Sequence, residues 1–367
     1  MDRRTFMEAM ALSAVSLGLS NVVSCANFKP KLDVLVLGGT YFLGPAIVNA
    51  FRNAGHAVTL FNRGLTNPDL FPDLPHIFGD RENGPEAYLA LQHKQWDLVI
   101  DVWPQRSVLV DESTAALQSY AKHYSFISSV AVYKNFNEAG RSEDDSVLDL
   151  PKDKSTWGYS EEKAASEKLV SDRFPNNHTI LRPGPIKGWR DPAHDLLYWL
   201  LKLQRNEDIL APGNGNDPLQ FIDVKDVAKF AVRAIENKLA GIYNCVGPKE
   251  NVLVWKDFLN LAKTHLQSTS KLYWSDKEFL ENHEVYAWEH LPLWAPISDD
   301  FFMEVSNAKA VAAGFNYSPL EKTLDDCLAW CRTKGNPDML FGVGDEPVGI
   351  TVQKEKEVIE SLERRDN

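Results

Sequence analysis

Cysteine is scarce in this 367-residue sequence, and histidines with metal-binding spacing are absent. Apart from Cys25, the cysteines are Cys245, Cys327 and Cys331, and their spacing fits neither a disulfide framework nor a zinc pattern. We therefore expect these three side chains to be buried apolar residues. The nine histidines contain no HxxxH or HxH pair, so we predict no metal site.

Basic charge is also in short supply. The chain holds 39 Lys and Arg against 51 Asp and Glu, a formal net charge of −12 at pH 7, and it has no basic stripe. Because polyanions are bound through clustered positive charge, we expect no nucleic acid as the main partner. The hydrophobic content of 44% and the charged content of 25% are those of an ordinary globular protein, and the length suffices for two lobes.

The amino terminus has features of an export signal. Arg3 and Arg4 form a twin arginine with Phe6 after them, and an uncharged stretch runs from Ala9 to Asn27. Its apolar part is shorter than the ~20 residues of a membrane span and is rich in Ser and Ala, as in a signal peptide. The RRxF pattern resembles signals of the twin-arginine pathway, which exports proteins already folded.

The end of this stretch, Val22 to Cys25, resembles a bacterial lipobox. We therefore expect residues 1–24 to be a cleaved signal peptide, Cys25 to be the first mature residue and residues 25–31 to be a linker. The mature chain would be exported to the periplasm, with a lipid on Cys25 as its only membrane attachment. An ordinary first helix with a chance arginine pair and a chance cysteine is the alternative.

A strand, a glycine turn, a helix and a second strand then succeed one another. Val34 to Leu37 is an apolar run of strand length, suited to a strand buried on both faces, and the glycine pair 38–39 ends it. Pro45 suits the first turn of a helix that ends near Gly55, and His56 to Phe61 forms the next strand. Such a turn presents backbone N–H groups and a positive helix end to a pyrophosphate. The alternative is a turn that uses its glycines only for packing.

The segment VLVLGGTYFLG resembles the TGGTGFIG fingerprint of the extended and atypical short-chain dehydrogenases/reductases, the NAD-dependent epimerase/dehydratase family. Tyr41 stands at the middle glycine of that fingerprint, and this departure resembles an atypical branch with GGTRFLG that includes epimerases and RNA-binding proteins. The resemblance implies a Rossmann fold, an α/β doubly wound parallel sheet, with a smaller C-terminal α/β substrate lobe. It implies cofactor contacts from Gly38, Gly39, Thr40, Tyr41, Phe42, Leu43 and Gly44.

The residues after the second strand bear on the choice of cofactor. Asn62 and Arg63 occupy the place where an acid would bind the adenosine ribose of NAD, and an Arg there accommodates the extra phosphate of NADP. We therefore predict NADP, with NAD and a merely superficial Arg63 as alternatives. Asp80 ends a short strand expected at 76–80, and the sequence GDR at this point resembles the family's adenine-side loop. Trp103 falls at the carboxyl end of a strand expected at 97–102, on the rim that binds ligands.

Tyr159 and Lys163 are four residues apart and would share one face of a helix. A phenol has a reference pKa near ~10, and an adjacent ammonium favours its ionised form, so the pair can act as acid or base. Ser129 follows a strand expected at 124–128, where its hydroxyl can bind the reacting oxygen. The alternative is a surface pair with a packed phenol ring.

The order of these features, a glycine turn, a strand ending in SSVAVY, a polar loop over 134–157 and then GYSEEKAASE, resembles the catalytic apparatus of the family. Carried over residue by residue, Ser129, Tyr159 and Lys163 match its catalytic triad, and Lys163 also grips the nicotinamide ribose. A strand at 178–182 then leads into a loop that resembles the one beneath the nicotinamide, with Pro183 as a cofactor contact.

We place the Rossmann domain at residues 32–188 and mainly the substrate lobe at 189–367. Residues 219–247 resemble the family's FIDVRDLA segment and its following strand, so we expect them to return to the Rossmann domain. Tyr198 and Trp199 suit a pocket wall or, equally, a plain core helix. The aromatic residues of YAWEHLPLW could stack on a sugar ring or pack the small lobe.

These features predict an NAD(P)-dependent epimerase or dehydratase that acts on a secondary alcohol, with a sugar or glycoside as the expected substrate and a tightly held cofactor. Two alternatives remain: an exported NADP-dependent reductase or dehydrogenase, and a non-catalytic dinucleotide-binding or RNA-binding member. The identity of the substrate, the direction of the reaction and the oligomeric state stay open.

Overall fold

The computed structural model describes residues 30–366, except for 103–104, 249–251 and 335–348. The expected signal peptide, Cys25 and Trp103 lie outside these described residues. Contacts divide the chain into two units, Met1–Lys31 and Leu32–Asn367, and every helix and strand of the described residues belongs to the second.

The core of the second unit is a seven-stranded sheet in the order β10-β6-β5-β4-β1-β2-β3. Every neighbouring pair of strands is parallel. The first strand in the sequence, β1, lies between β4 and β2, where the order of the strands reverses. This is the predicted doubly wound sheet. Its strands are β1 (Asp33–Leu37), β2 (Ala57–Asn62), β3 (His76–Phe78), β4 (Leu98–Asp101), β5 (Tyr124–Ile127), β6 (His178–Pro183) and β10 (Gly241–Cys245).

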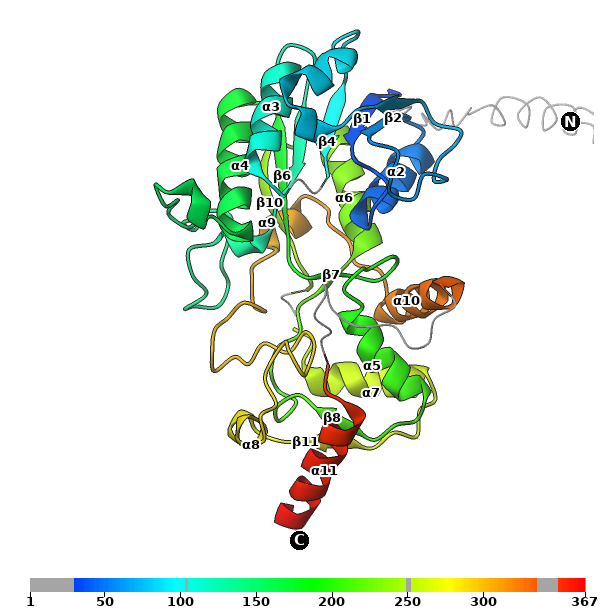
Figure 1. Cartoon of the computed structure of the whole chain (residues 1–367), viewed down its shortest axis with the longest axis vertical. Helices are drawn as coiled ribbons and strands as arrows, with labels where there is room; N and C mark the ends of the chain where they lie inside the picture. Colours follow the sequence, from blue (N-terminus) through cyan, green and yellow to red (C-terminus); the bar gives the residue numbers. More distant parts are fainter. Residues whose placement is uncertain (1–29, 103–104, 249–251, 335–348, 367) are drawn as a thin grey trace, which may run out of the picture. The chain divides into compact units, whose positions relative to one another are not determined.

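Helices cover both faces of the sheet (Figure 1). The helices α2 (Leu43–Asn53) and α6 (Val224–Glu236) pack together on one face, and α3 (Ser107–Leu117) and α4 (Tyr159–Arg173) pack together on the other. Each face therefore has its own apolar core. The strand β10 is the edge strand beside β6, and α6 packs on the sheet. Residues 224–245 therefore belong to the domain of the central sheet, although the segment before them belongs to the small lobe.

A third apolar core holds the small lobe together. Tyr198 is 4% exposed and Trp199 is fully buried in this core, so both belong to a core helix. Two short parallel pairs of strands, β7–β9 and β8–β11, accompany the helices. The helix α9 (Ala308–Ala312) contacts β10 and packs into a core of the central sheet. The other elements after β6 are β7 (Ile186–Lys187), α5 (Asp195–Gln204), β8 (Ile209–Ala211), β9 (Ile222–Asp223), α7 (Trp255–His265), β11 (Leu272–Trp274), α8 (Lys277–Asn282), α10 (Leu320–Lys334) and α11 (Val352–Asp366).

Apolar residues recur at helical spacing from Ser107 to Lys122 in the sequence, but α3 ends at Leu117. The amide of Tyr120 donates to the Leu117 carbonyl in a turn, and Ala121 then pairs with Trp96 at the edge of the sheet, so the chain leaves the helix early to enter β5. The side chains of Cys245, Cys327 and Cys331 are buried, as predicted. No helix of the described ranges is both long and apolar enough to cross a membrane.

Candidate active site

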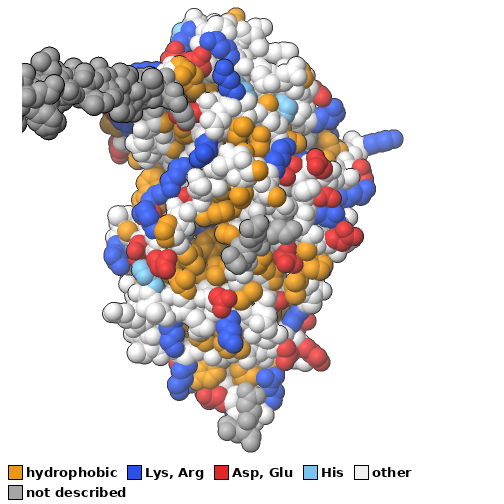
Figure 2. Space-filling model, turned by 180° about the vertical axis from the view of Figure 1, so that it is seen from behind, with side chains coloured by type: hydrophobic (Ala, Val, Ile, Leu, Met, Phe, Trp, Pro, Cys, Tyr) orange, Lys and Arg blue, Asp and Glu red, His pale blue; other side chains and the backbone are white. Residues whose placement is uncertain are grey.

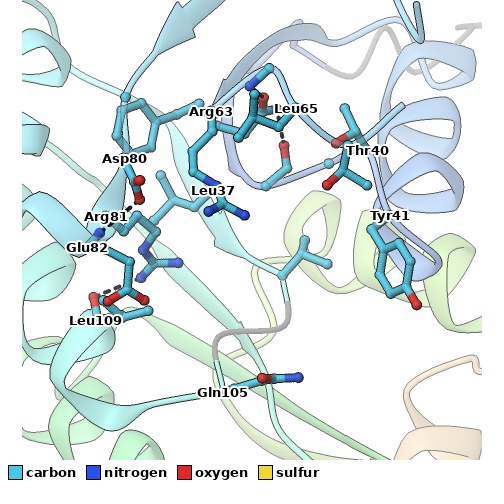
Figure 3. Close-up of a pocket in the computed structure, with 18 of the residues that line it drawn as sticks. Leu37, Thr40, Tyr41, Arg63, Leu65, Asp80, Arg81, Glu82, Gln105 and Leu109 are labelled. Atoms are coloured by element: carbon cyan, nitrogen blue, oxygen red, sulfur yellow. Dashed lines mark hydrogen bonds between the residues drawn. The ribbon is translucent and has the colours of Figure 1, made fainter. Parts of the chain in front are cut away.

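A cavity of about 420 Å³ lies at the carboxyl ends of β1 to β4, where a doubly wound sheet binds its ligand (Figure 3). The glycine turn forms one wall, and the segments after β2, β3 and β4 form the others. The predicted residues that line it are Gly38, Gly39, Thr40, Tyr41, Asn62, Arg63 and Asp80.

The backbone of the glycine turn has the shape that a pyrophosphate site requires. Gly38 and Gly39 have φ angles of +102° and +98°, which residues other than glycine rarely adopt. A Cβ at Gly44 would lie 2.7 Å from the carbonyl carbon of Gly39, so the glycine allows α2 to pack against the turn. No side chain caps the start of α2, and its first turn has no acid. These N–H groups and the positive helix end can therefore receive an anion.

Tyr41 replaces the expected glycine without backbone strain, because the positive φ in this part of the turn falls on Phe42 (φ 45°). The Tyr41 side chain is 52% exposed, and its hydroxyl points away from Arg63 in Figure 3. Partial burial and the charge of Asp191 raise the pKa of the Tyr41 phenol. Phe42, Leu43 and Gly44 are buried in the start of α2 and are not among the residues lining the cavity.

Three arginines line the cavity, and they differ in what binds them. Arg81 makes two hydrogen bonds to Asp101, of 2.7 and 2.9 Å. Arg106 forms an ion pair with Glu82. Among the described residues, none pairs with the guanidinium of Arg63, which reaches into the cavity in Figure 3.

Asn62 and Asp80 mainly organise the cavity wall. The Asn62 amide donates to the Gly38 carbonyl at 2.8 Å, and its oxygen accepts from the amide of Gly64 at 2.8 Å. One carboxylate oxygen of Asp80 accepts from the amide of Glu82 at 3.0 Å and caps the short 3₁₀ turn η1 (Arg81–Asn83). Their side chains therefore fix the loops after β2 and β3 around Arg63 and Arg81.

The structure brings Ser129, Tyr159 and Lys163 together. Ser129 follows β5, and its hydroxyl lies near enough to the Tyr159 phenol to lower the pKa of that phenol. Tyr159 is the first residue of α4, and the Lys163 ammonium lies 5.7 Å from the centre of its ring. Lys163 is 1% exposed and donates to the carbonyl of Ile127 at 2.7 Å. The end of β5 and the first turns of α4 therefore set this constellation.

The electrostatics of the pair differ from the expectation. Desolvation raises the pKa of Tyr159, opposed by the Ser129 hydrogen bond, so the expected lowering by the ammonium is absent in this state. The reason is geometric: the Lys163 ammonium is directed to a backbone carbonyl and lies beside the phenol ring. Burial also lowers the pKa of Lys163 to about 8, against the pull of Asp101 and Glu167.

The sequence model of the NAD dependent epimerase/dehydratase family matches residues 34–245, which is more than half of the chain. The protein belongs to this family. It is thus an NAD-dependent epimerase/dehydratase-type enzyme, and its cofactor is a nicotinamide dinucleotide.

Individual relatives are distant. The chloroplast stem-loop binding protein of 41 kDa b from Arabidopsis thaliana is 27% identical over 235 residues, which span 59% of this chain and 59% of that relative. UDP-glucuronic acid 4-epimerase from Bacillus cereus, solved with NAD, is 15% identical with a TM-score of 0.59 over 83% of this chain and 99% of its own. UDP-glucose 4-epimerase from Thermus thermophilus, also solved with NAD, is 19% identical with a TM-score of 0.57 over 82% and 98%. The two structures show that the fold is shared.

The cavity of this family member fits a dinucleotide. The uncapped start of α2 beside two positive-φ glycines suits the pyrophosphate, and the cationic Arg63 suits a further phosphate. Ser129, Tyr159, Lys163 and Pro183 are not among the residues lining the cavity; the first three form their own cluster, and Pro183 ends β6 beside Cys245 of β10.

Sequence reasoning missed Arg81, Glu82, Gln105, Arg106 and Leu109, which also line the cavity. A signal was present for some of them, because Gln105 and Arg106 follow a buried parallel strand, at the edge where ligands bind. Nothing in the sequence indicated that Arg81 and Asp101 would pair. No cluster of three or more His, Cys, Asp or Glu side chains in the described ranges could hold a metal ion.

Proposed function

We propose that the protein is an NADP-dependent epimerase or dehydratase acting on a secondary alcohol of a sugar or glycoside. The observation that carries this proposal is the cluster of Ser129, Tyr159 and Lys163, in which the serine hydroxyl lowers the pKa of the phenol and the Lys163 ammonium lies beside the phenol ring. When bound, the dinucleotide supplies a reversible hydride acceptor for the carbinol carbon. Tyr159 would move the proton of the substrate hydroxyl, and Ser129 would orient the reacting oxygen.

The sugar class is supported by the structural relatives, both of which are named as UDP-sugar 4-epimerases. For this chain we favour a free or glycan-linked sugar, because the export signal expected at residues 1–24 would take the mature enzyme to a compartment poor in nucleotide sugars. The same argument disfavours a simple dehydrogenase, which would need a freely exchanging coenzyme there. If the hydride returned to the substrate within each turnover, a retained cofactor would need no external regeneration.

The Arabidopsis relative, whose name describes stem-loop binding, favours the second candidate, a nucleic-acid-binding protein such as the RNA-binding member considered above. The charge of the chain counts against it, because net −12 disfavours contact with a phosphate backbone. Figure 2 shows a face on which acidic and basic side chains are interspersed around hydrophobic ones. Loss of sugar turnover on replacement of Tyr159 would favour the enzyme over this candidate.

The choice of NADP can be tested through Arg63. We expect Arg63→Ala to weaken NADP binding by about 1–2 kcal/mol while NAD binding stays nearly unchanged, because the guanidinium would make a charge-assisted contact only with the extra phosphate. Calorimetry on cofactor-stripped protein with both dinucleotides measures this. Arg106→Ala is the matched control: it removes a cavity arginine already paired with Glu82, and a much smaller NADP effect is expected. Equal affinities for the two dinucleotides, untouched by the Arg63 change, would refute the preference.

Tyr41 gives a test of cofactor retention. A bulky ring on the glycine turn would cover the bound pyrophosphate, so we expect protein dialysed after purification to keep a stoichiometric dinucleotide and Tyr41→Gly to release it about tenfold faster, ~1.4 kcal/mol. Mass spectrometry of the denatured protein quantifies the dinucleotide over time. Tyr286→Gly, an exposed tyrosine of the small lobe, is the control and should leave the rate unchanged. Wild-type protein that emerges empty and needs added coenzyme would contradict retention.

A further inference from the structure

A buried charged pair lies beside the catalytic lysine. Asp101 is the last residue of β4 and is completely buried. Its carboxylate binds both terminal nitrogens of Arg81, at 2.7 and 2.9 Å, and accepts from the Tyr124 hydroxyl at 2.8 Å. A buried carboxylate with this many hydrogen-bond partners is held in one place.

Arg81 is equally constrained. Besides Asp101, its guanidinium donates to the Tyr88 hydroxyl at 2.9 Å and to the Leu109 carbonyl at 2.8 Å. Desolvation lowers the pKa of the Arg81 guanidinium, but the charge and hydrogen bonds of Asp101 raise it by more, so the net shift is upward. Arg81 thus has few donors left for a cofactor phosphate, and its main partner is Asp101.

The register of the sheet places Asp101 on the side of Lys163. Asp101 is paired with Phe126 in the neighbouring parallel strand β5, and residues paired in this way point to the same face. The Lys163 ammonium lies 5.0 Å from the centre of the Phe126 ring and bonds to the carbonyl of the next residue, Ile127. The Asp101 carboxylate and the Lys163 ammonium therefore both lie near the carboxyl end of β5, on the face of the sheet that α3 and α4 cover.

We propose that Asp101 is a positioning residue that keeps the buried Lys163 amine in its charged form, with Arg81 limiting the strength of this effect. The role of that charge in catalysis rests on the proposed function. A fully buried amine would otherwise lose its proton, and a nearby anion is what restores the charged form. The direction of the Asp101 influence on the pKa of Lys163, upward against desolvation, agrees with this assignment.

The other charged groups around Lys163 do not replace Asp101. Glu167, one turn further along α4, also favours the ammonium, but it is bound at both oxygens by Arg182. Tyr159 on the same helix is neutral, because its pKa is raised. Burial opposes the charged amine, and Asp101 and Glu167 are the two groups whose charges favour it.

The test measures the titration of Lys163 directly. Protein carrying ¹³C-labelled lysine is titrated by NMR as purified, and Lys163→Arg assigns the signal. We expect Asp101→Asn to lower the pKa of Lys163 by about 1–2 units, since the anion is lost while Arg81 stays, and Arg81→Gln to raise it by a similar amount. Tyr124→Phe, which removes one hydrogen bond to Asp101 and no charge, should leave it nearly unchanged.

A general loosening of the fold cannot shift the pKa of Lys163 downward in Asp101→Asn and upward in Arg81→Gln. Should Asp101→Asn fail to fold, the upward shift in Arg81→Gln decides alone. A Lys163 signal that shifts in neither variant, or in the same direction in both, would overturn the proposal. Because the readout needs no substrate, it stays valid even if the protein turns out not to act on a sugar.

Discussion

Replacing Tyr159 by Phe is expected to abolish turnover and to leave dinucleotide binding nearly intact. The change removes one hydroxyl, the group that would carry the substrate proton. Loss of a positioned acid or base typically costs about 10²–10⁴-fold in rate. The assay follows the conversion of the substrate by NMR when the protein is mixed with free sugars, glycans and nucleotide sugars, because a hydride that is returned leaves the absorbance of the bound dinucleotide unchanged.

Tyr273→Phe is the matched control for this experiment. It makes the same chemical change in the small lobe, where the hydroxyl bonds to Glu363 at 3.0 Å. Turnover in the control should equal that of the wild type. A Tyr159→Phe protein that still turns over would remove the phenol from the mechanism and would revive the non-catalytic candidates.

The parts of the site that the sequence predicts are those set by local spacing. Four apolar residues, a glycine pair and a helix define the turn at Gly38, and a separation of four on a helix brings Lys163 beneath Tyr159. Such patterns depend on local backbone geometry, whereas the doubly wound order of the sheet was expected from the resemblance to the family. The structure confirms the predicted fold.

What the sequence did not predict are contacts between distant segments. Asp101 and Arg81 are 20 residues apart and meet only because β3 and β4 end at the same edge of the sheet. The raised pKa of Tyr159 likewise depends on how many neighbours exclude water, which no spacing rule gives. Tyr198 and Trp199 could be interpreted either way in the sequence, since a core helix and a pocket wall share the same periodicity.

A second large effect is expected at the ion pair that ties α4 to the sheet. Glu167 on α4 accepts two hydrogen bonds from Arg182 on β6, at 2.8 and 2.7 Å, and the side chains are only 7% and 2% exposed. The Arg182 guanidinium also lies 4.9 Å from the centre of the Tyr133 ring. Glu167→Gln leaves a buried cation without its counter-charge, so we expect the free energy of unfolding to fall by about 3–5 kcal/mol. Urea unfolding followed by circular dichroism measures the loss.

The same helix supplies the control. Lys168 and Asp172 form an exposed ion pair one turn apart, with side chains 70% and 59% exposed, and exposed pairs of this kind contribute roughly 0.2–1 kcal/mol. Asp172→Asn should therefore cost far less than Glu167→Gln. Replacing both buried partners, as in Glu167→Leu with Arg182→Met, should recover much of the lost stability, because no unpaired charge remains inside. If Glu167→Gln costs no more than Asp172→Asn, the buried pair does not anchor α4. Tyr159 and Lys163 would then owe their placement to the apolar contacts of that helix alone.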